Sequence, residues 1–178
     1  MKRAIVTGGS GAIGAAICRR LAGDGCHVYV HANTRLAQAQ NLAATIIAGG
    51  GSAQAVAFDV ADHAQTSAAL QALSADGAIQ IIVNNAGIHA DAVMPGMQVR
   101  QWSRVIEVSL NGFFNVTQPL LMAMIATRWG RIVNVSSIAA LACAWSATSN
   151  ATAWAEPPPA VIAAARLCAC ARRVLAWT

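Results

Sequence analysis

The sequence is poor in charged residues and in acidic residues above all. Of its 178 residues, 12 are Lys or Arg and 7 are Asp or Glu, whereas 56% are apolar. This balance excludes an intrinsically disordered chain. The basic residues are scattered and have no aromatic residues interleaved with them, which argues against nucleic acid as a partner. No apolar run reaches the ~20 residues of a membrane span, so we expect a cytoplasmic protein that does not bind membranes.

Cysteine is too sparse for a disulfide framework or a zinc site. The five cysteines are odd in number, none forms a C-x-x-C pair, and Cys168 and Cys170 have no histidine near them in the sequence. We therefore expect free thiols and no metal site. The chain also contains a single tyrosine, Tyr29, and a single lysine, Lys2. A reaction that needs a tyrosine or a lysine can therefore use only Tyr29 or Lys2.

Glycine is missing from the last part of the chain. All 14 glycines precede residue 131, and residues 143–178, a third of them alanine, hold three of the five Trp and three of the five Pro. This segment lacks the helix-end and turn signals of a folded domain. We therefore expect one domain at 1–142, followed by a tail at 143–178 that is not an independent domain. A change of reading frame near codon 143 would explain the tail, and genuine divergence is the alternative.

Residues 1–142 alternate short β-branched runs with longer amphipathic stretches. The expected strands are Arg3–Thr7, His27–Ala32, Ala53–Phe58, Ile79–Asn84 and Gly130–Val135. The expected helices are Ala12–Gly23, Thr34–Ala48, Ala64–Ser74 and Gln101–Thr127. Hydrophobic strands separated by helices are typical of a parallel sheet covered on both faces. The sequence therefore predicts an α/β fold of the Rossmann type, a doubly wound parallel sheet in α/β/α layers.

A glycine-rich turn joins the first strand to the first helix. It consists of Thr7, Gly8, Gly9, Ser10, Gly11, Ala12, Ile13 and Gly14. Glycines allow a pyrophosphate to approach the backbone closely, and the helix N-terminus offers unpaired N–H groups at the positive end of its dipole. This context predicts a dinucleotide-binding site, and a merely structural turn is the alternative.

The end of the second strand indicates which dinucleotide is bound. A site for NAD places an acid there to hold the ribose 2′-hydroxyl, but this chain has Asn33, Thr34 and Arg35. These residues could accept a 2′-phosphate, which favours NADP(H). The alternative for Arg35 is a solvated residue in the first turn of the next helix.

Two further strand ends contribute candidate cofactor-binding residues. Asp59, followed by Val60, either accepts a hydrogen bond from the adenine amino group or caps the next helix. After the fourth strand, Asn85, Ala86 and Gly87 provide small residues that close the strand beneath the cofactor.

These motifs, in this order, resemble the classical short-chain dehydrogenase/reductase family from Lys2 to about Ala142. The matching segments are Thr7–Gly14, Asp59-Val60, Asn84–Gly87, Asn111 and Gly130–Ser137. Within the family, Asn85–Ile88, Asp91 and Phe113–Thr117 are similar to 3-oxoacyl-[acyl-carrier-protein] reductases and acetoacetyl-CoA reductases.

The resemblance implies hydride transfer from NADPH to a 3-oxoacyl thioester on acyl carrier protein or coenzyme A. It assigns Ser137 to the substrate carbonyl and Asn111 to a water in the proton relay, and it implies a homodimer or homotetramer. In the family a tyrosine delivers the proton, and a lysine lowers the pKa of that tyrosine and binds the nicotinamide ribose.

The chain departs from the family pattern at this tyrosine and lysine. Asn150 stands where the tyrosine belongs, and Trp154 stands where the lysine belongs. We therefore expect a truncated fold, incomplete at its C-terminal side, and an inactive chain; a reductase by lineage and a non-catalytic nucleotide-binding remnant are both compatible with these residues. The uncovered edge at Gly130–Val135 and the apolar face of Gln101–Thr127 further predict weak stability or aggregation.

Overall fold

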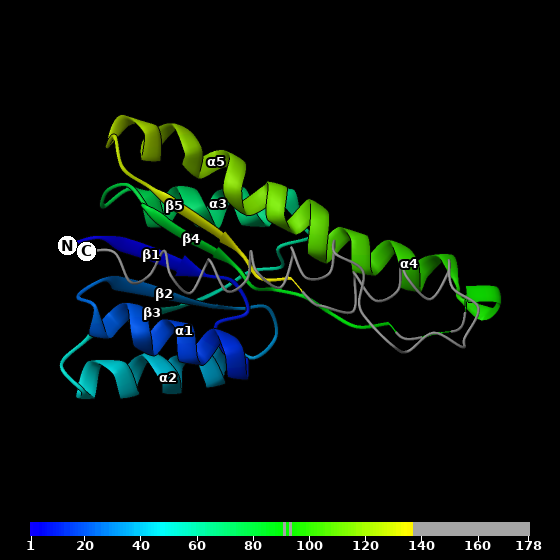
Figure 1. Ribbon diagram of the computed structural model, residues 1–178, viewed down its shortest axis with the longest axis horizontal. Coiled ribbons are helices and arrows are strands. Elements are labelled where there is room, and N and C mark those ends of the chain that lie inside the picture. The colour runs from blue at the N-terminus through cyan, green and yellow to red at the C-terminus, as the bar shows by residue number, and fades with distance from the viewer. Residues whose placement is uncertain (91, 93, 137–178) are drawn as a thin grey trace, which may run out of the picture. The chain divides into compact units, whose positions relative to one another are not determined.

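Five parallel strands form the centre of the protein. The computed structural model describes residues 1–90, 92 and 94–136 (Figure 1). The strands are β1 (Arg3–Val6), β2 (His27–Ala32), β3 (Ser52–Ala57), β4 (Ile81–Asn84) and β5 (Arg131–Asn134). They lie in the order β3-β2-β1-β4-β5, and every neighbouring pair is parallel. The chain reverses its direction across the sheet between β1 and β4, and in such sheets ligands bind at the carboxyl ends of the strands that flank this point.

Helices cover both faces of this sheet, which confirms the predicted α/β fold in doubly wound form. The helices are α1 (Ala12–Gly23), α2 (Leu36–Ala48), α3 (His63–Ser74), α4 (Val99–Ile106) and α5 (Gly112–Ala126). Figure 1 shows α1 and α2 on one face and α3 and α5 on the other. Short turns of 3-10 helix (η1, Met94–Gly96) and π-helix (η2, Glu107–Asn111) complete the described elements.

The core consists of two layers because neighbouring side chains of a strand point to opposite faces. Ala4 and Val6 pack with α1 and α2, whereas Ile5 packs with Leu70 of α3 and Val116 of α5. Both layers are buried along β1 from Ala4 onwards, since Ala4, Ile5 and Val6 have no exposed surface. β1 is therefore fixed from both sides, and so is the start of the turn that follows it.

The helix predicted at Gln101–Thr127 differs from the structure in its bounds and in its regularity. In the structure the helical segment begins at Val99, passes through the π-helical turn η2 and ends with α5 at Ala126. A π-helical turn inserts a residue and rotates the helix that follows it. Gly112, which follows this turn, packs on Val60 so closely that a Cβ on Gly112 would lie 2.8 Å from Val60 Cγ2. Pro119 lies inside α5 without ending it.

Residues Met1–Val135 form one compact unit. The domain boundary predicted at residue 142 and the tail 143–178 lie outside the described residues. Within the described ranges, no helix combines the length and the apolar character needed to cross a bilayer.

Candidate dinucleotide-binding site

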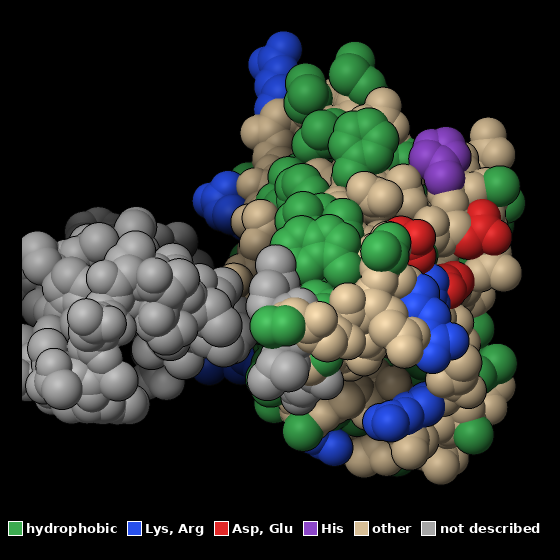
Figure 2. Space-filling view, turned by 90° about the vertical axis from the view of Figure 1, so that its right-hand side faces the viewer, with side chains coloured by type: hydrophobic (Ala, Val, Ile, Leu, Met, Phe, Trp, Pro, Cys, Tyr) green, Lys and Arg blue, Asp and Glu red, His purple; other side chains and the backbone are tan. Residues whose placement is uncertain are grey.

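The candidate cofactor residues gather at the carboxyl edge of the sheet. Because all strands are parallel, the segments that follow β1, β2, β3 and β4 emerge at the same edge. These segments carry Thr7–Gly14, Asn33–Arg35, Asp59 and Asn85–Gly87, respectively. Figure 2 looks onto this edge, where basic side chains lie beside acidic ones; the basic ones are arginines, because the single lysine, Lys2, is not at this edge.

Thr7 and Asn85 hold the turns after β1 and β4 together. The buried Thr7 hydroxyl oxygen accepts hydrogen bonds from the backbone N–H groups of Asn85 and Ala86, each at 2.9 Å. In return the Asn85 side-chain amide donates to the carbonyl oxygens of Thr7 at 2.9 Å and Gly8 at 3.2 Å. These reciprocal hydrogen bonds between Thr7 and Asn85 therefore fix the two turns relative to each other.

At Gly8 and Gly14 the turn has no room for a side chain. Gly8 has φ +63°, and a Cβ there would lie 3.1 Å from the Asn85 amide nitrogen. A Cβ on Gly14 would collide with the Gly8 carbonyl oxygen and come within 2.7 Å of Gly9 Cα. α1 can therefore start directly against the turn only because position 14 is glycine.

The start of α1 has the properties of an anion site. Its N-cap residue, Gly11, makes no side-chain cap, and the first turn contains no acidic residue. The N–H groups of Ala12, Ile13 and Gly14 therefore have no partner within the helix and lie at the positive end of its dipole. These donors fit the pyrophosphate of a dinucleotide.

Asp59 does not cap the next helix, so that alternative was wrong. α3 is capped by Asp62, whose side chain accepts a hydrogen bond from the Gln65 N–H at 3.0 Å. The Asp59 carboxylate instead accepts from the Ala61 N–H at 2.9 Å and from Arg104 Nη2 at 2.8 Å. Partial burial raises the pKa of Asp59, but the hydrogen bonds from Arg104 and Ala61 outweigh it and leave the pKa below its usual value. Asp59 is thus an ionised acceptor at the end of β3.

The segment after β2 is exposed and precedes α2. Asn33, Thr34 and Arg35 are all exposed, and the Asn33 side chain makes the smallest of the contributions that lower the pKa of Asp59. α2 begins at Leu36 rather than Thr34, which makes Arg35 its N-cap residue instead of a member of its first turn. This helix start, too, has no side-chain cap and no acidic residue in its first turn.

Asn111 is an exposed residue at the end of the π-helical turn η2. The start of α5 is tied to the end of β3, because the Asn115 side-chain amide donates to the Val60 carbonyl oxygen at 2.9 Å. The Val60 side chain is buried in the core. Ser137, Asn150 and Trp154 lie outside the described residues.

Tyr29 and Lys2 both lie away from the carboxyl edge. Tyr29 is 1% exposed in the middle of β2, and its hydroxyl is hydrogen-bonded to Arg3 at the amino end of β1. Lys2 Nζ lies 3.9 Å from the centre of the Trp129 ring, which precedes β5. Both contacts are at the amino edge of the sheet, opposite the glycine-rich turn.

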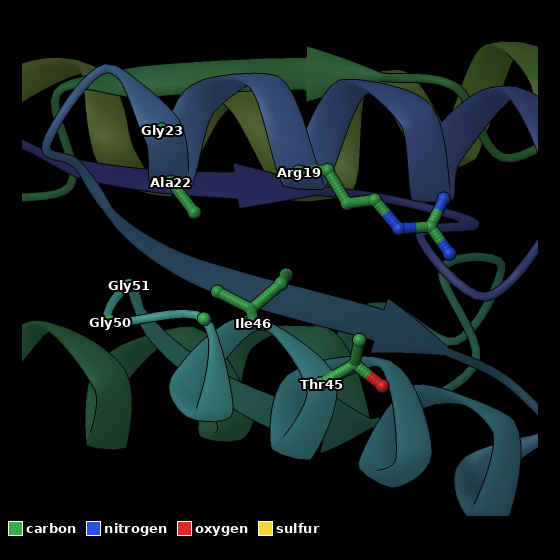
Figure 3. Close-up of a pocket in the computed structure, with 8 residues that line it drawn as sticks. Arg19, Ala22, Gly23, Thr45, Ile46, Gly50 and Gly51 are labelled. Carbon is green, nitrogen blue, oxygen red and sulfur yellow. The ribbon is translucent and has the colours of Figure 1, made fainter.

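A groove between α1 and α2 also lies apart from the site. Its lining includes Arg19, Ile46 and Gly50, near the C-terminal ends of these helices (Figure 3). Cys18 and Cys26 are buried free thiols, as expected. Burial raises the pKa of Cys18 to about 12. Among residues 1–90, 92 and 94–136, no three His, Cys, Asp or Glu side chains form a metal site.

Sequence analysis did not identify Arg104 or His31 as part of this edge. Arg104 comes from α4, far from Asp59 in the sequence, and no local pattern indicates their pairing. His31 lies on the same face of β2 as His27, because side chains four residues apart in a strand point the same way. His27 bonds to Ser52 Oγ at 2.7 Å, whereas His31 bonds to the glycine-rich turn.

Comparisons with known proteins agree with this geometry. The profile of the family described as short chain dehydrogenase matches residues 2–152. A 3-oxoacyl-[acyl-carrier-protein] reductase of Aggregatibacter actinomycetemcomitans is 37% identical over 139 residues, which are 77% of this chain and 57% of that protein. An acetoacetyl-CoA reductase of Cupriavidus necator is 38% identical over 143 residues, which are 76% of this chain and 55% of that protein.

Solved structures show the same relationship. The gluconate 5-dehydrogenase of Burkholderia cenocepacia, in complex with NADP and tartrate, is 37% identical with a TM-score of 0.72 and covers 77% of this chain and 54% of its own. A metagenomic short-chain oxidoreductase in complex with NADP is 32% identical with a TM-score of 0.74. The chain thus spans little more than half the length of the relatives it matches. Since the family profile covers most of the chain and the fold agrees with it, this protein belongs to the short-chain dehydrogenase family.

Proposed function

We propose that this chain binds NADP(H) at the carboxyl edge of its sheet and derives from a cytoplasmic reductase of 3-oxoacyl thioesters. The observation that carries the proposal is the start of α1, which has no side-chain cap. It lies against a turn in which positions 8 and 14 can hold only glycine, because a Cβ at either position would be crowded by neighbouring atoms. The glycines let the pyrophosphate approach, and the N–H groups of Ala12 and Ile13 bind it.

The choice of NADP(H) over NAD(H) rests on the segment after β2. No acid follows this strand, so nothing there repels a 2′-phosphate or holds a 2′-hydroxyl. Arg35 supplies a positive charge at the start of α2, and the uncapped helix adds its dipole. Asn33 and Thr34 flank this position with polar side chains. The two solved relatives described above are both NADP complexes.

The remaining cofactor contacts come from β3 and β4. Asp59, ionised and held by Arg104, accepts a hydrogen bond from the adenine amino group, with Val60 fixing the backbone beside it. Asn85, Ala86 and Gly87 line the cofactor after β4, in the position that Thr7 fixes. A bound nicotinamide supplies the hydride for a ketone substrate.

The names of two relatives support the proposed substrate class, since they describe reductases of 3-oxoacyl-[acyl-carrier-protein] and of acetoacetyl-CoA. Ser137 would hold the carbonyl of such a thioester, and Asn111 would order a water for the proton relay. Proton delivery needs an acid beside the carbonyl with a pKa lowered by a cation. Asn150 and Trp154 provide neither group, and Tyr29 and Lys2 are held at the amino edge. We therefore propose that the chain binds the cofactor without reducing a substrate.

A titration of the purified chain with NADPH and NADH, followed by nicotinamide fluorescence, tests the cofactor assignment. We expect saturable binding of NADPH. NADH should bind at least about tenfold more weakly, because it lacks the 2′-phosphate and so loses one charge-assisted contact. Arg35→Ala should remove this preference. Arg20→Ala is the matched control, because Arg20 is an exposed arginine of α1 that pairs with Asp24. Equal binding of both dinucleotides would contradict the assignment.

A further inference from the structure

His31 is a buried histidine whose ring nitrogens both have partners at the cofactor edge. It is the penultimate residue of β2 and is 1% exposed. The ring lies against Phe58, with the ring centres 4.1 Å apart. A polar side chain buried this deeply needs hydrogen bonds within the protein that replace those it would form with water.

Its two hydrogen bonds fix one protonation state. The Gly8 backbone N–H, which can only donate, points at His31 Nδ1 at 3.1 Å. The Phe58 carbonyl oxygen, which can only accept, lies 2.8 Å from His31 Nε2. Nδ1 must therefore be unprotonated and Nε2 must carry the hydrogen, so the ring is neutral. If Nδ1 were also protonated, its N–H would face the N–H of Gly8, and neither group could accept a hydrogen bond.

These bonds join three separate strand ends. Gly8 follows β1, His31 is at the end of β2, and Phe58 follows β3 and directly precedes Asp59. The backbone carbonyl of His31 also accepts from the Gly9 N–H at 2.7 Å. One residue thus holds two successive amides of the glycine-rich turn and, through Phe58, the backbone that carries Asp59.

We infer that His31 is a positioning residue for dinucleotide binding, which fixes the glycine-rich turn at a set distance from Asp59. The inference rests on the proposed function. The turn would hold the pyrophosphate and Asp59 the adenine, so an error in their spacing weakens both contacts at once. His31 itself touches neither group, because its two ring nitrogens are already occupied.

Burial, and not the nearby charges, keeps His31 in its neutral state. Burial lowers the pKa of His31 to about 4, although the Phe58 carbonyl and the nearby Asp59 carboxylate act in the opposite direction. Arg104 pairs with that carboxylate at 2.8 Å and offsets its charge. At neutral pH the ring therefore accepts from Gly8, and only acid conditions disrupt the arrangement.

Three variants separate positioning from packing. His31→Leu removes both hydrogen bonds and keeps an apolar group beside Phe58, whereas His31→Gln offers an oxygen to Gly8 and an N–H to Phe58. His27→Leu is the matched control, since His27 lies on the same face of β2 at its other end. We expect NADP⁺ to bind at least about tenfold more weakly to His31→Leu, and within about threefold of wild type to His31→Gln and His27→Leu. Unchanged affinity in His31→Leu would overturn the inference.

A second measurement on the ligand-free protein keeps this test independent of the proposed function. Amide hydrogen exchange at Gly8 should be at least about tenfold faster in His31→Leu than in wild type or in His27→Leu. If wild type binds no NADP(H) while this exchange rises as expected, the positioning of the turn stands and the proposed function fails. If exchange at Gly8 is unchanged in His31→Leu, the inference fails whether or not the dinucleotide binds.

Discussion

Arg104 Nη2 lies 2.8 Å from Asp59 Oδ2 and so connects α4 to the end of β3. Arg104 also lies 3.7 Å from Glu107, and its side chain is 43% exposed. A pair this accessible to solvent adds little stability, so Arg104→Ala should lower the free energy of unfolding by less than about 1 kcal/mol. Its effect is to keep Asp59 ionised and oriented. A urea titration of the variant checks the magnitude, and a loss of several kcal/mol would show that the pair is a main support of the fold.

Asp59 itself should matter for the nucleotide. We propose that the Asp59 carboxylate accepts a hydrogen bond from the adenine amino group. Asp59→Asn removes its charge, so NADPH affinity should fall about tenfold. Asp62→Asn is the control, because asparagine also caps a helix and Asp62 faces Gln65 rather than the site. Fluorescence titration of the two variants side by side makes the comparison. A larger loss in Asp62→Asn than in Asp59→Asn would remove Asp59 from the site.

Gly14 is the position where a methyl group should do most harm. Gly14→Ala places a Cβ against the Gly8 carbonyl oxygen and 2.7 Å from Gly9 Cα. Relief of this overlap should cost about 1–3 kcal/mol of stability and should move the turn out of register with the pyrophosphate. NADPH binding should therefore become undetectable or weaken more than tenfold, as judged by calorimetry.

Gly23→Ala provides the matched control in the same helix. Nothing lies within 4 Å of a Cβ at Gly23, and its φ is not positive. Alanine there should stabilise the protein by about 0.5–1 kcal/mol and leave NADPH affinity unchanged. If both variants weakened binding equally, the effect of Gly14 could not be assigned to the turn.

Stability should depend on pH through His31. Its pKa lies below that of the unfolded chain, so the native state favours the neutral ring. The contribution is therefore fully present above the unfolded pKa and is lost as pH falls from about 6.5 towards about 4, by on the order of 3 kcal/mol at most. Burial and Arg3 also lower the pKa of His27, which adds a smaller effect of the same sign.

Urea midpoints between pH 7.5 and 4.5 measure this dependence. His31→Gln does not titrate and should flatten the acid loss, whereas His27→Gln should flatten it less. Identical slopes in wild type and in His31→Gln would show that the imidazole is not the group responsible.

We also expect the purified chain to self-associate. Trp102 of α4 and Phe114 of α5 are each 55% exposed, and burial of a large apolar side chain contributes about 1.5–3 kcal/mol. Trp102→Gln combined with Phe114→Gln should therefore weaken association at least about tenfold in sedimentation experiments. Ile47→Gln is the control, because Ile47 is equally exposed but belongs to α2 on the other face of the sheet. A monomeric wild type with a cooperative thermal transition would contradict this prediction.

The coding sequence tests the origin of residues 143–178. We expect one of the other two reading frames beyond codon 143 to encode a Tyr-x-x-x-Lys helix. Sequencing of the gene and its transcript decides the matter. If neither frame encodes such a helix, the tail has diverged rather than shifted frame.

Local sequence patterns predicted the framework well. The bounds of α1 and β2 agree with the structure. Glycines mark both ends of α1 and precede β2, and polar residues follow β2. The turn Thr7–Gly14 was recognisable because the strand before it and the helix after it define its role. Pairings between distant residues were not predictable in this way. Asp59 with Arg104, and His31 with Gly8 and Phe58, meet only after the sheet has formed.

The most direct test of the central claim combines binding and turnover in one cuvette. NADPH fluorescence is titrated with the purified chain, acetoacetyl-CoA is then added, and absorbance of the reduced nicotinamide is followed. We predict saturable binding that Gly14→Ala abolishes, and no oxidation of NADPH above the protein-free rate. Steady oxidation would show that another residue of this chain delivers the proton, and absence of binding would show that the glycine-rich turn is structural only.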